Sequence, residues 1–239
     1  MAAETQTLLD TEKKIIMKFF SDASESDVKK IDVSTLAWAK HTLTLSAAST
    51  ENFKIGEVLT TGGAETFLVT DFTAGATTVT VVGWDNTNKK ATSIDTGMSN
   101  GDAIVGGVSG SHTETVANSG AFTELDYNVL VIKIMWITNG ETVAIEWDGS
   151  TAEKYIGEFG GNGSWSLPGM ELPGIGINAT GDSSEVLGDI QFTTADQSGT
   201  DSYTIIMELK KQAPGYDVPA YEENASLGYR VDYLLGNFT

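Results

Sequence analysis

The chain has 239 residues and a mass of 25.4 kDa, which is the size of one large domain or two small ones. Its 33 Asp and Glu residues against 14 Lys and Arg residues give a net charge of −19. This balance excludes a protein that binds nucleic acid through a basic surface, because affinity for phosphate comes from Lys and Arg. Hydrophobic residues make up 40% of the chain, which is enough for a packed core, and the absence of cysteine excludes disulfides, thiolate nucleophiles and cysteine-based zinc sites.

The N-terminal residues do not have the pattern of a secretory signal peptide. Acidic residues precede the first basic residue, and the apolar run Ile15–Met17 ends at Lys18. The most apolar segment, Val129–Ile137, is too short for a membrane-spanning helix and contains Lys133. We therefore expect synthesis in the cytoplasm without a signal peptide, and no membrane partner.

The first 33 residues contain two conflicting periodicities. Several apolar residues approximate a helical spacing, yet Ile15, Met17 and Phe19 also alternate with polar residues as in a strand. The segment Ser21–Asp27 is polar and resembles a turn, and Val28–Val33 is typical of a further strand. We favour a hairpin here.

Residues 50–120 differ from their flanks in being rich in glycine, with short predicted strands over 55–60, 65–71, 77–82 and 102–105. We expect a small β-rich, barrel-like insertion domain over 50–120. It would interrupt a discontinuous β-sandwich body formed by 1–49 and 121–211, although one continuous domain of nine or ten strands is the alternative.

The segment from residue 128 to 147 predicts a β-hairpin. Asn139-Gly140 stands between two strand patterns, and this pair favours a type I′ turn, because both central residues need positive φ. The first of these strands is apolar on both faces, Met135 and Ile137 included, with Lys133 as the exception. It is either a central strand covered on both sides or part of a subunit interface.

Alternation is clearest near the end of the body. Tyr203, Ile205, Met207 and Leu209 share one face of a strand, as do Val143, Ile145 and Trp147 earlier in the chain. Repeated short strands of this kind, separated by glycine clusters, predict an all-β fold, specifically an antiparallel β-sandwich.

Residues 212–239 predict an extended C-terminal arm. Pro214 and Pro219 exclude a central strand. The arm is unusually aromatic for a tail, so we expect it to dock on its own body or on a partner. The candidate interface residues are Tyr216, Tyr221, Tyr229, Tyr233, Leu234 and Phe238.

No motif in the chain predicts catalysis. The two histidines, His41 and His112, lie in no zinc-binding pattern, and the GxGxxA match over 174–179 lacks the following helix that a dinucleotide site needs. Carboxylates are abundant without a catalytic spacing, so we expect no enzyme, no metal and no cofactor. The acids considered are Glu141, Glu146 and Asp148 for glycoside hydrolysis and Asp182, Glu185 and Asp189 for calcium.

Two tryptophans suggest a glycan-binding alternative, because sugar rings stack on exposed indoles. Trp84 and Trp165 lie in the turn-like contexts Gly83-Trp84-Asp85 and Gly163-Ser164-Trp165 and are the possible glycan contacts. Trp136 and Trp147 lie in phase with apolar neighbours and are expected in the core.

Three separated blocks resemble a β-sandwich protein common among tailed phages, especially marine ones. They are SESDVKKIDVSTL (24–36), VIKIMWITNGETVAIEWDGS (131–150) and GDIQFTTADQSGTDSYTIIMELKK (188–211). Residues 55–84 are similar to small β insertions of phage head proteins, whereas the aromatic arm lies outside the pattern. The resemblance implies a virion component of the head-associated or decoration type, and it brings no catalytic residues.

The function we expect is therefore that of a capsid decoration or cement protein on the outer surface of a phage head. Its partners would be the major capsid protein or other virion proteins, and we expect a homo-oligomer, preferably a trimer. A neck, tail or fibre-associated protein and a glycan-binding surface module are the alternatives.

Overall fold

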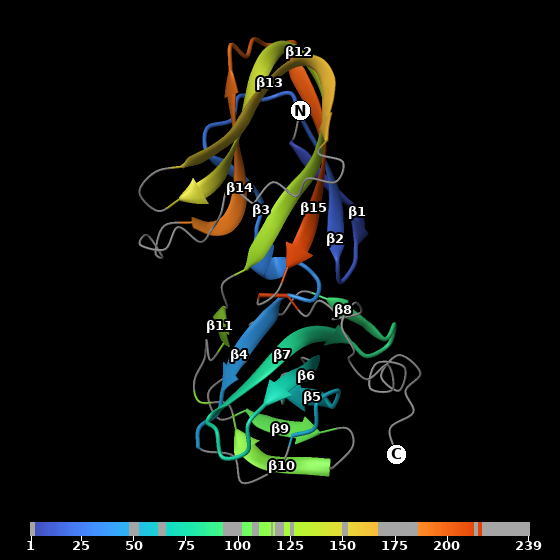
Figure 1. Cartoon of the computed structure of the whole chain (residues 1–239), viewed down its shortest axis with the longest axis vertical. Helices are drawn as coiled ribbons and strands as arrows, with labels where there is room; N and C mark the ends of the chain where they lie inside the picture. Colours follow the sequence, from blue (N-terminus) through green and yellow to red (C-terminus); the bar gives the residue numbers. More distant parts are fainter. Residues whose placement is uncertain are drawn as a thin grey trace. The chain divides into compact units, whose positions relative to one another are not determined.

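The computed structural model describes residues 3–47, 53–61, 66–92, 102–106, 110–115, 117, 122–124, 127–149, 153–166, 186–212 and 215–216. Antiparallel strands dominate these residues, together with one short 3₁₀ turn, Val33–Thr35, so the predicted all-β class is confirmed (Figure 1). The chain divides into two compact units. The first comprises Met1–Val33 with Asp126–Pro214, and the second Ser34–Leu125 with Gly215–Thr239.

The boundaries of these units differ from the predicted domains. Strand β4 (Lys40–Thr44), expected in the sandwich body, pairs with strands of the second sheet and belongs to the second unit. The chain enters the second unit between residues 33 and 34 and returns to the first between residues 125 and 126, whereas the predicted boundaries were 49/50 and 120/121. A strand pattern alone does not say which sheet the strand joins, and this is why the boundary was misplaced.

The first unit contains one seven-stranded antiparallel sheet, in the order β1-β2-β15-β12-β14-β3, with β13 paired to the other edge of β12. Its strands are β1 (Glu4–Asp10), β2 (Lys14–Ser21), β3 (Val28–Ile31), β12 (Asn128–Gly149), β13 (Lys154–Ser166), β14 (Val186–Ala195) and β15 (Ser202–Gln212).

Strand β12 is continuous through Asn139-Gly140, so the predicted hairpin is wrong. β13 runs alongside β12 from Lys154 to Ser166, and the two strands bend over together (Figure 1). At the bend the register shifts between Ile137 and Thr142, Gly140 has a φ of 84°, and Gly161 on β13 has a φ of 69°. The positive φ that a turn requires serves equally well for a bend in a long strand.

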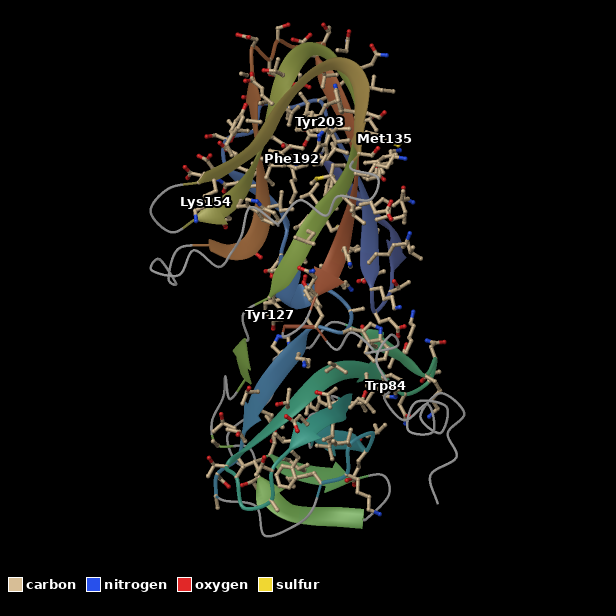
Figure 2. All side chains as sticks on the ribbon, viewed as in Figure 1. Trp84, Tyr127, Met135, Lys154, Phe192 and Tyr203 are labelled. Atoms are coloured by element: carbon tan, nitrogen blue, oxygen red, sulfur yellow. The ribbon has the colours of Figure 1, made fainter. Side chains whose placement is uncertain are left out.

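The bend divides the sheet into two arms. In the first arm, β12 pairs with β15 over 128–139, followed by β2 and β1; in the second arm it pairs with β14 over 142–149, followed by β3. The inner faces meet: the rings of Phe19 on β2 and Phe192 on β14 are 5.1 Å apart, and Phe192 and Tyr203 lie between the arms (Figure 2). The folded sheet is thus a sandwich made by strands that change layer.

The predicted alternation is confirmed in this core. The residues expected on one face of β15, from Tyr203 to Leu209, are all buried, as are Val143, Ile145 and Trp147 on β12. Val129 and Val131 are also buried, but Met135 and Ile137 are 37% and 64% exposed, so the expectation of a strand covered on both sides is wrong for this part of β12.

The predicted strands on either side of Ser21–Asp27, which are β2 and β3, are present but do not pair with each other, and the hairpin in the first 33 residues is formed by β1 and β2 instead. β2 pairs with β1 and β15, whereas β3 pairs with β14 in the other arm. The segment that we took for a hairpin turn instead carries the chain from one layer to the other.

The second unit is built on a curved eight-stranded antiparallel sheet in the order β10-β9-β5-β6-β7-β4-β11, with β8 paired to β7 (Figure 1). Both faces of its central strands are buried. Phe67, Val69 and Val81 belong to one core cluster, and Leu68 and Val82 belong to another. The remaining strands are β5 (Val58–Thr61), β6 (Thr66–Phe72), β7 (Thr78–Asp85), β8 (Lys90–Thr92), β9 (Ala103–Gly106), β10 (Gly110–Thr115) and β11 (Phe122–Glu124).

Candidate functional site

The outer face of the first arm combines apolar side chains with lysines, and we call it the lysine face. Side chains that alternate with the buried core positions of β2, β12 and β15 point to this face. Its apolar residues are Leu9, Ile16, Phe20, Met135, Ile137 and Ile206, and its charged residues are Lys14, Lys18, Lys133, Lys210, Glu4 and Glu208.

Strand register places these side chains in rows across the arm. Met135, Ile206 and Lys18 form one row, because Met135 lies opposite Ile206 and Ile206 lies opposite Lys18. In the next row Lys133 lies opposite Glu208. Glu208 also forms an ion pair with Lys14, with 2.9 Å between Lys14 Nζ and Glu208 Oε1. Within the described residues, Lys18 and Lys133 have no ion-pair partner.

The charge of this face is opposite to that of the chain. It carries four lysines and two glutamates, although the whole protein has a net charge of −19. A local excess of cations beside exposed apolar side chains is the pattern expected of a surface that meets an acidic partner.

A depression of about 430 Å³ lies at the β13 edge of the lysine face. Met135, Ile137 and Ile206 line it together with the β13 segment Asn162–Ser164. Gly163 is required here, because a Cβ at this position would lie 2.4 Å from the ring of Trp136, the residue opposite Gly163 on β12. The missing side chain thus leaves room for the indole of Trp136, which packs on Phe159 with 4.8 Å between the ring centroids.

The outer face of the second arm is acidic, and we call it the acidic face. Among the residues that the structure describes, its carboxylates include Asp27, Glu146, Asp148 and Glu158, and Lys29 on this face is engaged by Asp189 at 2.7 Å. Partial burial raises the pKa of Glu146, and repulsion from Glu153 and Asp27 adds to this. Tyr155, 51% exposed, donates a hydrogen bond to Glu158 on this face.

Buried ionic groups hold the first unit together between the two faces. Lys30 Nζ contacts Glu25 Oε1 at 2.6 Å, and the Tyr203 hydroxyl donates to Glu25 Oε2 at 2.7 Å. Burial, followed by the hydrogen bond to Glu25, raises the pKa of Tyr203 well above its ordinary value. Lys211 is buried beside Asp10, and burial lowers its pKa. The Tyr203–Glu25 and Lys211–Asp10 contacts join residues that are 178 and 201 positions apart in the sequence, so these buried groups are structural.

Glu141 is the exception among these buried groups. It is 3% exposed, and within the described residues neither carboxylate oxygen has a hydrogen-bond partner. Burial, and then repulsion from Asp201 and Glu25, raises the pKa of Glu141 to about 7. The folded state therefore holds a proton that the unfolded state releases near pH 4.5, so folding stability falls as the pH rises from about 4.5 through 7.

We expect Glu141→Gln to remove this loss of folding stability at higher pH. At pH 8 the variant should be more stable than the wild type by about 1–3 kcal/mol, whereas at pH 4.5 the two should be nearly equal. Urea denaturation of both proteins at the two pH values measures the difference, and an equal gain at both would contradict the assigned titration.

The two tryptophans predicted as glycan contacts are not exposed in turns. Trp84 is 4% exposed and packs in a core cluster with Leu68 and Val82, edge-to-face with Trp38, so its exposure was wrongly predicted (Figure 2). Its position in β7, a strand buried on both faces, explains the burial. Trp165 lies within β13, opposite Ile134, and is half-buried; it is not in a turn. Trp147 is in the core as predicted.

The start of the predicted C-terminal arm docks within the second unit. Tyr216 is fully buried and forms a β-bridge with Ala39, and the carbonyl of Gly215 accepts a 2.8 Å hydrogen bond from the amide of Lys40. The other candidate interface residues lie outside the described residues, namely Tyr221, Tyr229, Tyr233, Leu234 and Phe238.

The remaining candidate residues do not converge. His41 is buried with Nδ1 3.2 Å from the carbonyl of Ala39, and Asp189 is engaged by Lys29. The GxGxxA segment, Asp182 and Glu185 lie outside the described residues. Across the parts of the chain that the structure describes, no group of three or more His, Asp or Glu side chains is placed to hold a metal, and no helix has the length and hydropathy for a membrane crossing.

Comparison with known proteins identifies no family for this chain. No protein-family model matches, and no curated protein matches. One solved structure is similar at 9% identity over 84% of this chain and 78% of that chain, with a TM-score of 0.16; it is described as manganese lipoxygenase of Gaeumannomyces graminis with a partial structure of zonadhesin of Komagataella pastoris. At this TM-score the likeness supports no statement about function.

Proposed function

We propose that this protein is a non-enzymatic structural component of a tailed-phage particle, of the capsid decoration or cement type, and that it acts through the lysine face. The observation that carries the proposal is the exposure of Ile137 (64%) and Met135 (37%) among lysines on a protein of net charge −19. Large exposed apolar side chains gathered on one face mark a contact surface.

The resemblance to tailed-phage proteins supports the same proposal. The blocks 131–150 and 188–211 that carry it coincide with β12, β14 and β15, the strands that build both outer faces. A protein added to a shell in many copies needs stiff, complementary surfaces, and a sandwich whose layers share two continuous strands provides them.

The proposal predicts that the chain binds phage heads. When purified protein is added to heads that lack it, we expect the wild type to cosediment with them. Ile137→Ser should reduce binding by about ten- to a hundredfold, because burial of this side chain contributes about 1.5–3 kcal/mol.

Ile55→Ser is the matched control, since Ile55 is also exposed (46%) but belongs to the second unit. Its binding should equal that of the wild type. Cosedimentation with necks or tails instead of heads would favour the alternative virion locations, and failure to bind any part of the particle would overturn the proposal.

A further inference from the structure

The first unit carries two outer faces of opposite charge. The lysine face has four lysines and two glutamates, and the acidic face has four carboxylates beside the Lys29–Asp189 ion pair. The arms pack inner face against inner face, as the 5.1 Å contact between Phe19 and Phe192 shows, so the two outer faces point in opposite directions.

We propose that copies of this chain associate head to tail, with the lysine face of one copy on the acidic face of the next. The inference names a neighbouring copy on the particle as the partner of the lysine face, so it rests on the proposed role of that face in assembly, and Ile137→Ser then weakens incorporation into the particle by removing a contact between copies. Complementary charge across the contact selects this partner over a neutral one.

Charge also excludes the symmetric alternative. In a two-fold dimer each face meets the same face of the other copy, so the lysine face, with its excess of cations, would meet a second face with the same excess, and the acidic face would meet a second acidic face. Like charges across a contact cost free energy, whereas a heterologous contact opposes lysine to carboxylate.

Apolar side chains are available on both sides of such a contact. Met135 and Ile137 are exposed on the lysine face, and Tyr155 (51%), which lies opposite Glu146, is exposed on the acidic face. Tyrosine is enriched in interface cores because it buries a large area at a small cost in side-chain entropy.

A head-to-tail contact leaves one face of each terminal copy open. Because the two outer faces point in opposite directions, successive copies stack into an open chain, and a small ring such as the trimer expected from the sequence would need the faces to be inclined to each other. Both faces belong to one sandwich, so the contact does not depend on the second unit.

Sedimentation velocity of the full-length protein tests the inference without any phage particle. Between 0.1 M and 1 M salt the Debye length falls from about 10 Å to about 3 Å, so the wild type should form oligomers at the lower concentration and dissociate at the higher. A wild type that stays monomeric at 0.1 M salt and about 1 mM protein would overturn the inference.

Charge reversal on each face identifies the contact. Lys18→Glu with Lys133→Glu should weaken association at least about tenfold, and so should Glu146→Lys with Glu158→Lys. An equimolar mixture of the two double variants should associate again, because each supplies a face complementary to the other. This recovery also shows that both variants are folded.

The matched control is Lys89→Glu with Lys90→Glu, which makes the same change in net charge on exposed residues of the second unit. It should associate like the wild type. Sensitivity to the lysine-face variant alone, or no recovery on mixing, would overturn the head-to-tail arrangement. Self-association without binding to heads would support this inference and contradict the proposed function. Binding to heads without self-association would support the proposed function and contradict this inference.

Discussion

Replacing Lys30 with Met should lower the free energy of unfolding of the first unit by about 3–5 kcal/mol. Lys30 Nζ and Glu25 Oε1 lie 2.6 Å apart, and both side chains are 5% exposed. The substitution keeps most of the aliphatic stem but leaves the Glu25 carboxylate buried with only the Tyr203 hydroxyl as the partner recorded among the described residues. Hydrogen exchange of the β14 and β15 amides measures this unit separately from the second one.

The double variant Lys30→Met with Glu25→Gln is the control for this prediction. A neutral amide can still accept the hydrogen bond from Tyr203, so the double variant should lose less stability than Lys30→Met alone. A loss below about 1 kcal/mol for Lys30→Met would show that the buried pair does not hold β3 to the rest of the sandwich.

Gly140→Ala should destabilise the first unit by about 2–3 kcal/mol, because two costs coincide at the bend of β12. Gly140 has a φ of 84°, where a side chain is strained, and a Cβ there would lie 2.2 Å from Asp201 Oδ1. Asp201 cannot move away freely, since its other carboxylate oxygen accepts hydrogen bonds from the amide and hydroxyl of Ser198 at 2.7 and 2.8 Å.

Gly199→Ala provides the comparison, since a Cβ at Gly199 meets nothing within 4 Å. It lies in the same β14–β15 connection as Asp201 and should change stability by less than about 0.5 kcal/mol. Denaturant unfolding, monitored by hydrogen exchange, compares the two variants. Equal losses of stability would mean that the bend does not depend on Gly140.

Local alternation predicted the part of the fold that depends on one strand at a time. The pattern of β15 from Tyr203 to Leu209 alternates cleanly, and the structure buries those residues. Such a strand needs no information about its neighbours to reveal which face is inside.

The bend in β12 shows where local signals are insufficient. Asn139-Gly140 has the composition of a hairpin turn, yet the flanking halves pair with β15 and β14 and continue alongside β13. Only the long-range pairing distinguishes a turn from a bend, and a single sequence does not contain it directly.

The lysine face was found only in part for the same reason. Met135, Ile137 and Lys133 are close in sequence, and the apolar pattern on both faces of their strand left a subunit interface as one of two alternatives. Lys14 meets Glu208 across a separation of 194 residues, so its contribution depends on the pairing of β2 with β15. Trp84 was predicted to be exposed and is buried, because its turn-like Gly-Trp-Asp sequence lies in a strand that is buried on both faces.

Electron cryomicroscopy of the intact particle tests most directly whether this protein works by assembly through its two charged faces. The account predicts density for the protein on the outer shell, with the lysine face of the first unit covered by the acidic face of a neighbouring copy. A particle without this protein, or one in which Met135, Ile137 and the surrounding lysines point into solvent, would contradict it.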